Sequence, residues 1–138
     1  MLALHFHIGE EDHEYAHVEV MGANGDGWLP SRVTVRAGSF QGEFPSYLDC
    51  WAFARFAAQL RELHKLLKGT ATFSTYEKQL ELDLVGDGLG HVTVRGEAMD
   101  YAGTGNRLTF HLDIDQTYLP KILGDVEAIV AAFPPPAA

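Results

Sequence analysis

Apolar and polar residues alternate along most of the chain, as they do in β-strands that bury one face. In the first such segment, Leu4, Phe6 and Ile8 fall on one face and histidines fall on the other. The alternation predicts seven to eight strands, over residues 3–8, 14–20, 31–37, 39–44, 70–73, 79–85, 91–99 and 107–114. We expect Pro45 to end the fourth strand, because proline has no N–H group to donate to a sheet.

Two other segments repeat apolar residues at the three- and four-residue spacing of an α-helix. They predict helices over about residues 49–68 and 117–133. Asp49 is a suitable N-cap for the first helix, and Gly69 stands where a left-handed residue often ends one. Proline is tolerated only in a first helical turn, so Pro120 places the start of the second helix close by, with Thr117 as the expected cap.

The elements therefore follow the order strands, helix, strands, helix. Glycine-rich links at residues 86–90 and 102–106 are typical of hairpins, so neighbouring strands are expected to pair antiparallel. This order predicts an α+β fold, made mainly of antiparallel sheet with two helices. We expect a single domain over residues 1–138, with a frayed tail at residues 134–138.

The tetrapeptide VTVR occurs twice, at residues 33–36 and 92–95. Each copy lies in a half of the chain that runs through strands and then a helix, which is the pattern that a duplicated half would leave. Four alternating β-forming residues also recur by chance. The sequence leaves both interpretations open.

Charge narrows the class of partner. The chain has 138 residues, with 10 basic and 19 acidic side chains, and a formal net charge of −9. This balance disfavours nucleic acid and anionic membranes, because both reward clustered Lys and Arg. It suits a basic protein partner, or it serves solubility alone.

A single cysteine, Cys50, is typical of a reducing cytosol, and we expect neither a membrane span nor a signal peptide.

Asp113 and Asp115 lie two residues apart, so both carboxylates fall on one face of the last strand. Such a pair, with His111 on the same face, could bind a divalent cation or share acid–base work. A structural interpretation is simpler. Asp115 stands where a carboxylate accepts free N–H groups at a helix start, and Asp113 belongs to a solvated polar face.

Histidines gather near the N-terminus. His5 and His7 share a strand face, and a hairpin would bring His13 and His17 against them. Three imidazoles and a carboxylate from the acidic segment Glu10–Glu14 would suit zinc or another first-row ion. The H-x-H pattern is a weak signal, however, and an ordinary exposed strand is the alternative.

The remaining reactive residues do not form a catalytic group. Cys50 lies beside Trp51 at a helix start, with no histidine base near it in sequence, and we expect a buried structural thiol. The serines occur in no G-x-S-x-G context, and the glycine-rich loops lack the lysine of a phosphate-binding loop. The sequence offers no persuasive active site.

Four motifs in the second half of the chain form a recognisable pattern. They are L-K-G-x-A at Leu67–Ala71, L-x-L within Leu80–Leu84, G-D-G-x-G-H-x-x-V at Gly86–Val94, and D-Q-T-Y-L-P at Asp115–Pro120. Over roughly residues 48–133 the chain resembles bacterial immunity proteins of the WapI type, which are partners of contact-dependent toxins with variable C-terminal toxic domains. The first 45 residues carry little of this resemblance beyond alternating strands.

The resemblance implies a small cytosolic protein without cofactor that binds and neutralises a cognate toxin. Because the sequence also lacks a catalytic group, we interpret the chain as a non-catalytic binding protein that acts by occlusion. Such proteins vary most where they touch the toxin, so no contact residue carries over. From the residues themselves, we expect contact through the acidic segment Glu10–Glu14 or through the polar face of the later strands. That polar sheet face comprises Glu81, Asp83, Arg95, Glu97, His111 and Asp113.

Two alternatives stay open. One is a metal-binding protein or metal-dependent enzyme that uses His5, His7, His13 and His17. The other is a domain that self-associates through an exposed strand edge.

Overall fold

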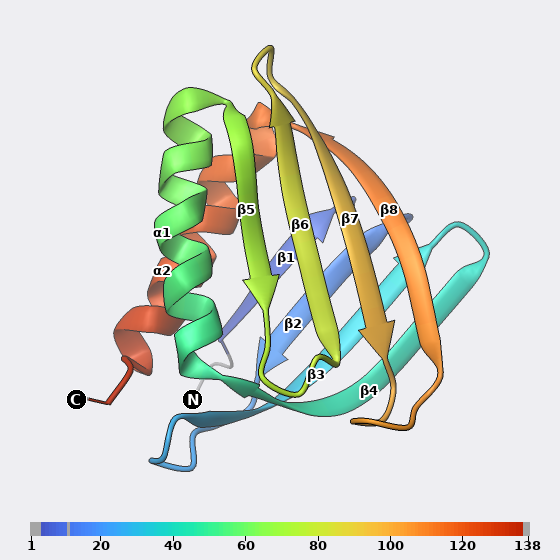
Figure 1. Cartoon of the computed structure of the whole chain (residues 1–138), viewed down its shortest axis with the longest axis vertical. Coiled ribbons are helices and arrows are strands. Elements are labelled where there is room, and N and C mark those ends of the chain that lie inside the picture. Colours follow the sequence, from blue (N-terminus) through green and yellow to red (C-terminus); the bar gives the residue numbers. More distant parts are fainter. Residues whose placement is uncertain (1–3, 11, 137–138) are drawn as a thin grey trace.

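Each half of the chain folds into a four-stranded antiparallel meander that is followed by a helix (Figure 1). The computed structural model describes residues 4–10 and 12–136. The first meander comprises β1 (Leu4–Gly9), β2 (Tyr15–Val20), β3 (Trp28–Ala37) and β4 (Phe40–Asp49). The second comprises β5 (Lys68–Ser74), β6 (Leu80–Asp87), β7 (His91–Met99) and β8 (Arg107–Asp115). The helices are α1 (Cys50–Leu66), the short 3₁₀ turn η1 (Gln116–Tyr118) and α2 (Leu119–Ala132).

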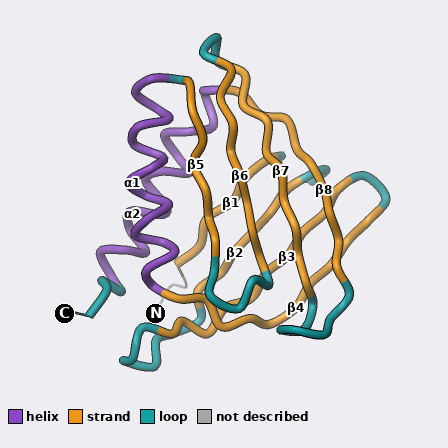
Figure 2. The backbone as a smooth tube through the Cα atoms, in the orientation of Figure 1, coloured by secondary structure: helices purple, strands orange, loops and turns teal. Residues whose placement is uncertain are grey.

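The two sheets stack with their apolar faces toward each other, and both helices lie along the same side of the stack (Figure 2). There α1 packs against β5, α2 packs against β1, and the helices pack on each other. The predicted α+β fold is confirmed. Its eight strands divide between two sheets because each meander buries one face and needs a second layer to cover it.

Helix α1 begins as predicted and ends earlier. The Asp49 carboxylate caps it by accepting from the Ala52 N–H at 3.0 Å. The left-handed residue at its end is Leu67, with φ of 58°, and the prediction of Gly69 is wrong. The helix stops here because the left-handed conformation of Leu67 turns the chain out of the helix. Its N–H makes the last helical bond, to the Leu63 carbonyl at 2.7 Å, and β5 starts at the next residue.

Pro120 lies in the first turn of α2, as predicted. Two other predictions, about Pro45 and Thr117, are wrong. Pro45 does not end β4, which continues to Asp49. Strand β4 is the edge of its sheet, where a missing N–H group forfeits no ladder hydrogen bond. Thr117 is not a cap either, because Asp115 caps η1 and α2 follows from Tyr118 without a side-chain cap.

The repeated tetrapeptide occupies equivalent positions in the two halves. Residues 33–36 lie in β3 and residues 92–95 lie in β7, so each copy is in the third strand of its meander. Both meanders then lead into a helix on the same side of the stack. The two halves therefore share one order of elements.

Four phenylalanines join these layers. Phe6 of β1, Phe53 and Phe56 of α1, and Phe73 of β5 are all fully buried. The Phe73 ring lies 5.4 Å from Phe6 and 5.0 Å from Phe53, measured between ring centroids, in edge-to-face arrangements that aromatic pairs favour. The cluster links the first sheet, the second sheet and α1 at one point.

Replacing Phe73 by alanine should lower the free energy of unfolding by about 3–5 kcal/mol, because a buried ring is lost and the surrounding rings cannot fill the cavity. Phe40→Ala is the matched control: this ring is 66% exposed, and its loss should change stability by no more than about 0.5 kcal/mol. Chemical denaturation measures both. Equal effects of the two substitutions would contradict the assigned role of the cluster.

Candidate functional site

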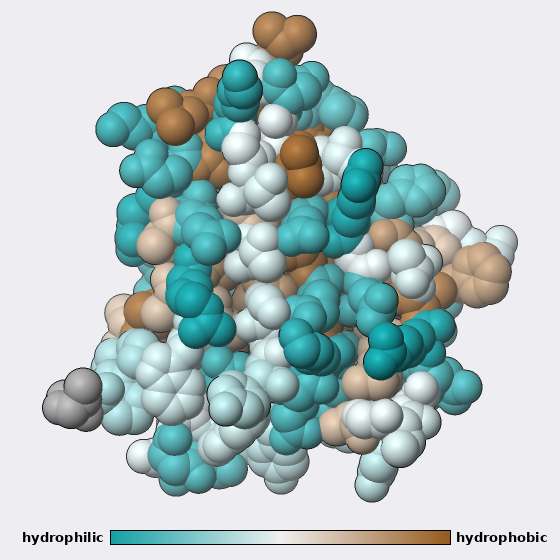
Figure 3. Space-filling model, in the orientation of Figure 1, coloured by the Kyte–Doolittle hydropathy of each residue, from teal (hydrophilic) through white to brown (hydrophobic). Residues whose placement is uncertain are grey.

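The outer face of the second sheet carries the six polar residues expected from the sequence. Antiparallel register places Asp83, Arg95 and His111 side by side in one row across β6, β7 and β8. The rows beside it hold the other three, Glu81, Glu97 and Asp113. Figure 3 shows mostly hydrophilic and neutral residues over this face, with hydrophobic residues in small separate areas. The fold thus gathers these residues on one surface.

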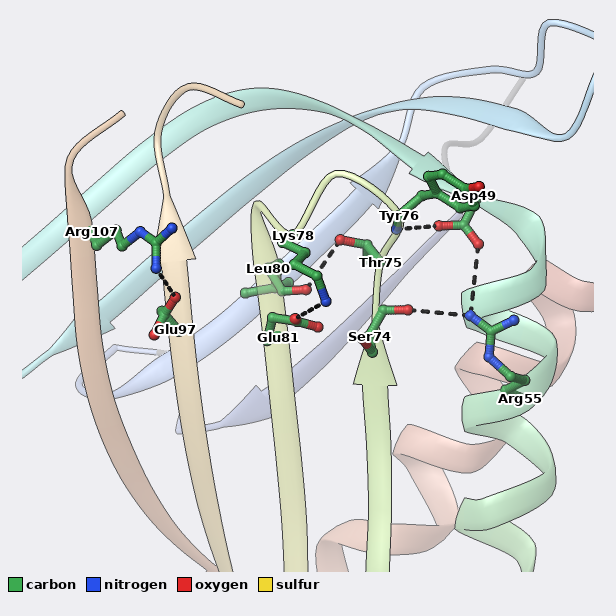
Figure 4. A network of polar contacts seen from close by, with 10 residues as sticks. All are labelled: Asp49, Arg55, Ser74, Thr75, Tyr76, Lys78, Leu80, Glu81, Glu97 and Arg107. Atoms are coloured by element: carbon green, nitrogen blue, oxygen red, sulfur yellow. Dashed lines mark hydrogen bonds and ion pairs between the residues drawn. The ribbon is translucent and has the colours of Figure 1, made fainter. Parts of the chain in front are cut away.

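Several of these side chains form ion pairs with residues of the sheet or of the β5–β6 loop. Lys78 lies 3.3 Å from Glu81, and Arg107 lies 3.2 Å from Glu97 (Figure 4). Ion pairs at a protein surface contribute only about 0–1 kcal/mol to stability. A partner protein can therefore replace them with its own contacts at small cost.

The acidic segment Glu10–Glu14 lies next to this face. A small cleft of about 100 Å³ lies between the β1–β2 turn and β8, and it is lined by Glu10, His13, Glu14, His111, Leu112 and Asp113. The two surfaces that we expected separately are therefore continuous. Glu11, which belongs to the same segment, lies outside the described residues.

Three of the four N-terminal histidines come together. His7 and His17 are paired across β1 and β2, with their Nδ1 atoms 2.9 Å apart, and the His5 ring lies 5.2 Å from that of His17. They line a groove of about 440 Å³ that extends to the start of α2. His13 is in the turn and lines the acidic cleft instead. Within residues 4–10 and 12–136, no three His, Cys, Asp or Glu side chains are grouped to hold a metal ion.

Contact between the histidines affects their charge. In a hydrogen bond between two Nδ1 atoms one imidazole donates and the other accepts, so the accepting ring is neutral. The pKa of His17 lies below its ordinary value of 6.5, chiefly because the ring is half-buried and then because His7 and His5 are close. Glu19 opposes this shift in part.

Asp115 has the structural role that we favoured. Its carboxylate accepts from the Thr117 N–H at 2.8 Å and from the Thr117 hydroxyl. These bonds, led by that of the hydroxyl, lower the pKa of Asp115. Asp113 belongs to the polar face, where its Oδ1 lies 3.4 Å from His91 Nε2. The two carboxylates thus have different partners.

Cys50 is buried at the start of α1, as predicted. Burial raises the pKa of its thiol, and the neighbouring Asp49 raises it further. The thiol is therefore protonated at neutral pH, whereas a nucleophilic cysteine requires the thiolate.

Asp49 itself connects two parts of the molecule. Besides capping α1, it accepts from the Tyr76 N–H at 2.9 Å, and Arg55 lies 3.9 Å away (Figure 4). The helix start and the β5–β6 loop are therefore held together by one buried carboxylate. This contact fixes the position of the loop that carries Tyr76.

A groove that sequence reasoning missed lies at this end of the sheets. It measures about 490 Å³ and is lined by Pro30, Ser31, Pro45, Ser46, Tyr47, Glu77, Gln79, Asp100, Tyr101 and Ala102. These residues come from β3, β4 and the loops after β5 and β7, so no local sequence pattern predicts the groove. Tyrosines in glycine-rich or polar loops were the one available signal.

Three of the four motifs that carry the resemblance meet at the opposite end of the sheets, whereas the L-x-L motif runs along β6. The Gly88 N–H donates to the Leu67 carbonyl at 2.8 Å, and the Gln116 N–H donates to the Gly90 carbonyl at 2.7 Å. A side chain at Gly86 would place its Cβ 2.6 Å from the Leu67 oxygen, so glycine is required by close packing. These motifs build the joints between α1, the β6–β7 hairpin and η1.

Comparison with known proteins agrees with this pattern. The model of the immunity protein WapI-like family matches residues 4–134. The chain belongs to that family. The match begins at β1, so it extends beyond the resemblance over residues 48–133 and includes the N-terminal strands. No curated protein matches the chain.

Membership of the WapI-like family supports an immunity role and implies a protein partner. The described helices do not include one that is long and apolar enough to cross a membrane.

Asp115→Ala should lower the melting temperature at neutral pH, because the carboxylate no longer accepts from Thr117. The lowered pKa means that this stabilisation is present above the ordinary value of 3.8 and is lost as pH falls through the folded-state pKa. Thermal unfolding at neutral and strongly acidic pH measures the difference, which should shrink in acid. A folded variant that has lost partner binding would show that Asp115 acts at the interface instead.

Acid should destabilise the protein through His17. Because its folded-state pKa is lowered, the unfolded chain takes up the proton first, and stability falls as pH drops below about 6.5. The loss ends once the folded form also protonates. The free energy of unfolding of His17→Gln should therefore vary less between about pH 7 and pH 5 than that of the native protein. His64→Gln, which removes an imidazole from the exposed surface of α1, is the matched control.

Proposed function

We propose that this protein neutralises a cognate bacterial toxin domain in the cytoplasm by binding to it and covering its working surface. The observation that carries the proposal is the family match over residues 4–134. The protein would act by occlusion and stoichiometrically, without changing the toxin chemically.

Charge supports a basic partner. A net charge of −9 attracts a positively charged domain, such as a toxin that must bind nucleic acid, and speeds their encounter. Association should therefore slow as salt concentration rises, since ions screen long-range attraction.

We propose that contact includes the polar sheet face, defined above, together with the acidic segment beside it. The shared cleft at His13 and His111 makes them one continuous surface. The ion pairs of Glu81 and Glu97 are at the surface and are replaceable by pairs with a basic partner.

The test begins with affinity capture of the tagged protein from its native bacterial lysate, read by mass spectrometry. We expect one large multidomain protein at a stoichiometric level. Its C-terminal domain should then arrest growth when expressed alone and be harmless when this protein is co-expressed. A C-terminal domain that binds but stays toxic would overturn neutralisation, and the lack of any such partner would count against the immunity role.

Charge reversal tests the contact surface. Asp83→Lys should weaken binding of the captured toxin domain by about 10-fold or more, because it places a like charge opposite a basic surface. Glu62→Lys makes the same charge change on the exposed surface of α1 and should leave affinity nearly unchanged. Binding is measured by calorimetry with purified proteins. Equal losses for both variants would indicate a general effect of charge and no local contact at the sheet face.

A further inference from the structure

The groove at the loop end has a lining of unusual composition. Tyr47 on β4 is 53% exposed and Tyr101 in the β7–β8 loop is 69% exposed, so both rings are available to a partner. Glu77 and Asp100 also line the groove, and the described residues along it include no basic side chain. Aromatic faces and carboxylates both attract cations. The lining therefore favours a positively charged group.

The floor of the groove offers hydrogen-bond acceptors. Ser46 and Gln79 are 4% and 5% exposed. The Ser46 hydroxyl donates to Gln79 Oε1 at 3.0 Å, and Gln79 Nε2 donates to the Met99 carbonyl at 3.1 Å. Having used its proton, the Ser46 oxygen keeps its lone pairs for an incoming N–H group. The Ser31 hydroxyl donates to the Leu29 carbonyl at 2.8 Å, so its oxygen also keeps its lone pairs for an incoming N–H group.

These features together match one side chain. Arginine presents a planar cation that stacks on tyrosine rings and carries five N–H donors for carboxylate and hydroxyl oxygens. Lysine has a compact charge and cannot stack in this way. Building on the proposed function, we propose that the groove binds an arginine side chain of the toxin partner, between Tyr47 and Tyr101.

The rim of the groove is suited to a protein interface. Tyr76, which is 79% exposed, precedes Glu77 in the β5–β6 loop and packs edge-on against Trp28 at 5.9 Å between ring centroids. Three of the five tyrosines in the chain, from three separate segments, are thus at this end. Tyrosine is among the residue types that most often dominate the binding energy of interfaces. The arginine would enter at the centre of an aromatic contact.

The groove can be tested without knowing the toxin. The full-length protein is titrated with N-acetyl-arginine methylamide and, separately, with the citrulline analogue, which has nearly the same shape and no charge. Arginine should bind with a dissociation constant on the order of 1–10 mM and shift the NMR amide signals of Ser46, Glu77, Gln79 and Tyr101. Citrulline should bind at least about 10-fold more weakly, since it loses the charge. Equal shifts with both ligands, or shifts elsewhere in the protein, would overturn the proposal.

Substitutions in the groove test whether it contributes to binding of the toxin domain. Tyr101→Ala and Glu77→Gln should each weaken binding of the captured toxin domain by about 10-fold or more. Leu89→Ala is the control, because this side chain is 91% exposed in the β6–β7 hairpin at the other end of the sheets. Melting temperatures near that of the native protein establish that the variants are folded.

The outcomes separate the two proposals. Full toxin binding by Tyr101→Ala and Glu77→Gln would reject the groove as a contact site and leave the immunity function intact. A captured toxin domain that the native protein fails to neutralise would reject the function, and the arginine titration would still decide the chemistry of the groove.

Discussion

Edge-to-face packing of four phenylalanines is the contact on which the architecture depends. Each meander buries only one face, and neither helix is buried without the sheets beside it. Strand β1, helix α1 and strand β5 contribute the four rings, Phe6, Phe53, Phe56 and Phe73. A single cluster therefore joins both sheets and a helix. Because this apolar contact lies inside the stack, the outer sheet face and the loop ends need not contribute to the core and are available for recognition.

The two ends of the sheets differ in how strongly the fold depends on their residues. At one end, backbone hydrogen bonds and a close-packed glycine connect α1, the β6–β7 hairpin and η1, and the residues involved are those of the family motifs. At the other end, the exposed tyrosines contact little of the core, although Asp49 holds their loop in place. Substitutions at the first end threaten the fold, whereas those at the second mostly alter the surface. This separation explains why motifs that identify the family say little about what the protein touches.

Sequence periodicity was sufficient for the strands, for both helices and for the faces on which Asp83 and His111 lie. It failed where distant segments decide the local structure. Pro45 stays within a strand because β4 is an edge of its sheet. Helix α1 ends at Leu66, and the carbonyl of the capping residue Leu67 also accepts a hydrogen bond from the Gly88 N–H. The groove between Tyr47 and Tyr101 was invisible for the same reason, since its residues are far apart in sequence. The cross-strand pair His7 and His17 was predictable because a hairpin fixes it locally.

Pro45 also limits pairing of the β4 edge with a strand of another chain. A neighbouring chain can extend a sheet only where the edge strand offers both donors and acceptors, and Pro45 removes a donor from the middle of β4. The edges of β1 and β5 are flanked by α2 and α1, which leaves β4, with 10 residues, and β8, with 9 residues, as the edges without a helix packed along them. Pairing of β4 with a second copy of the chain is thereby opposed by one residue that a central strand would exclude, whereas β8 carries no such residue.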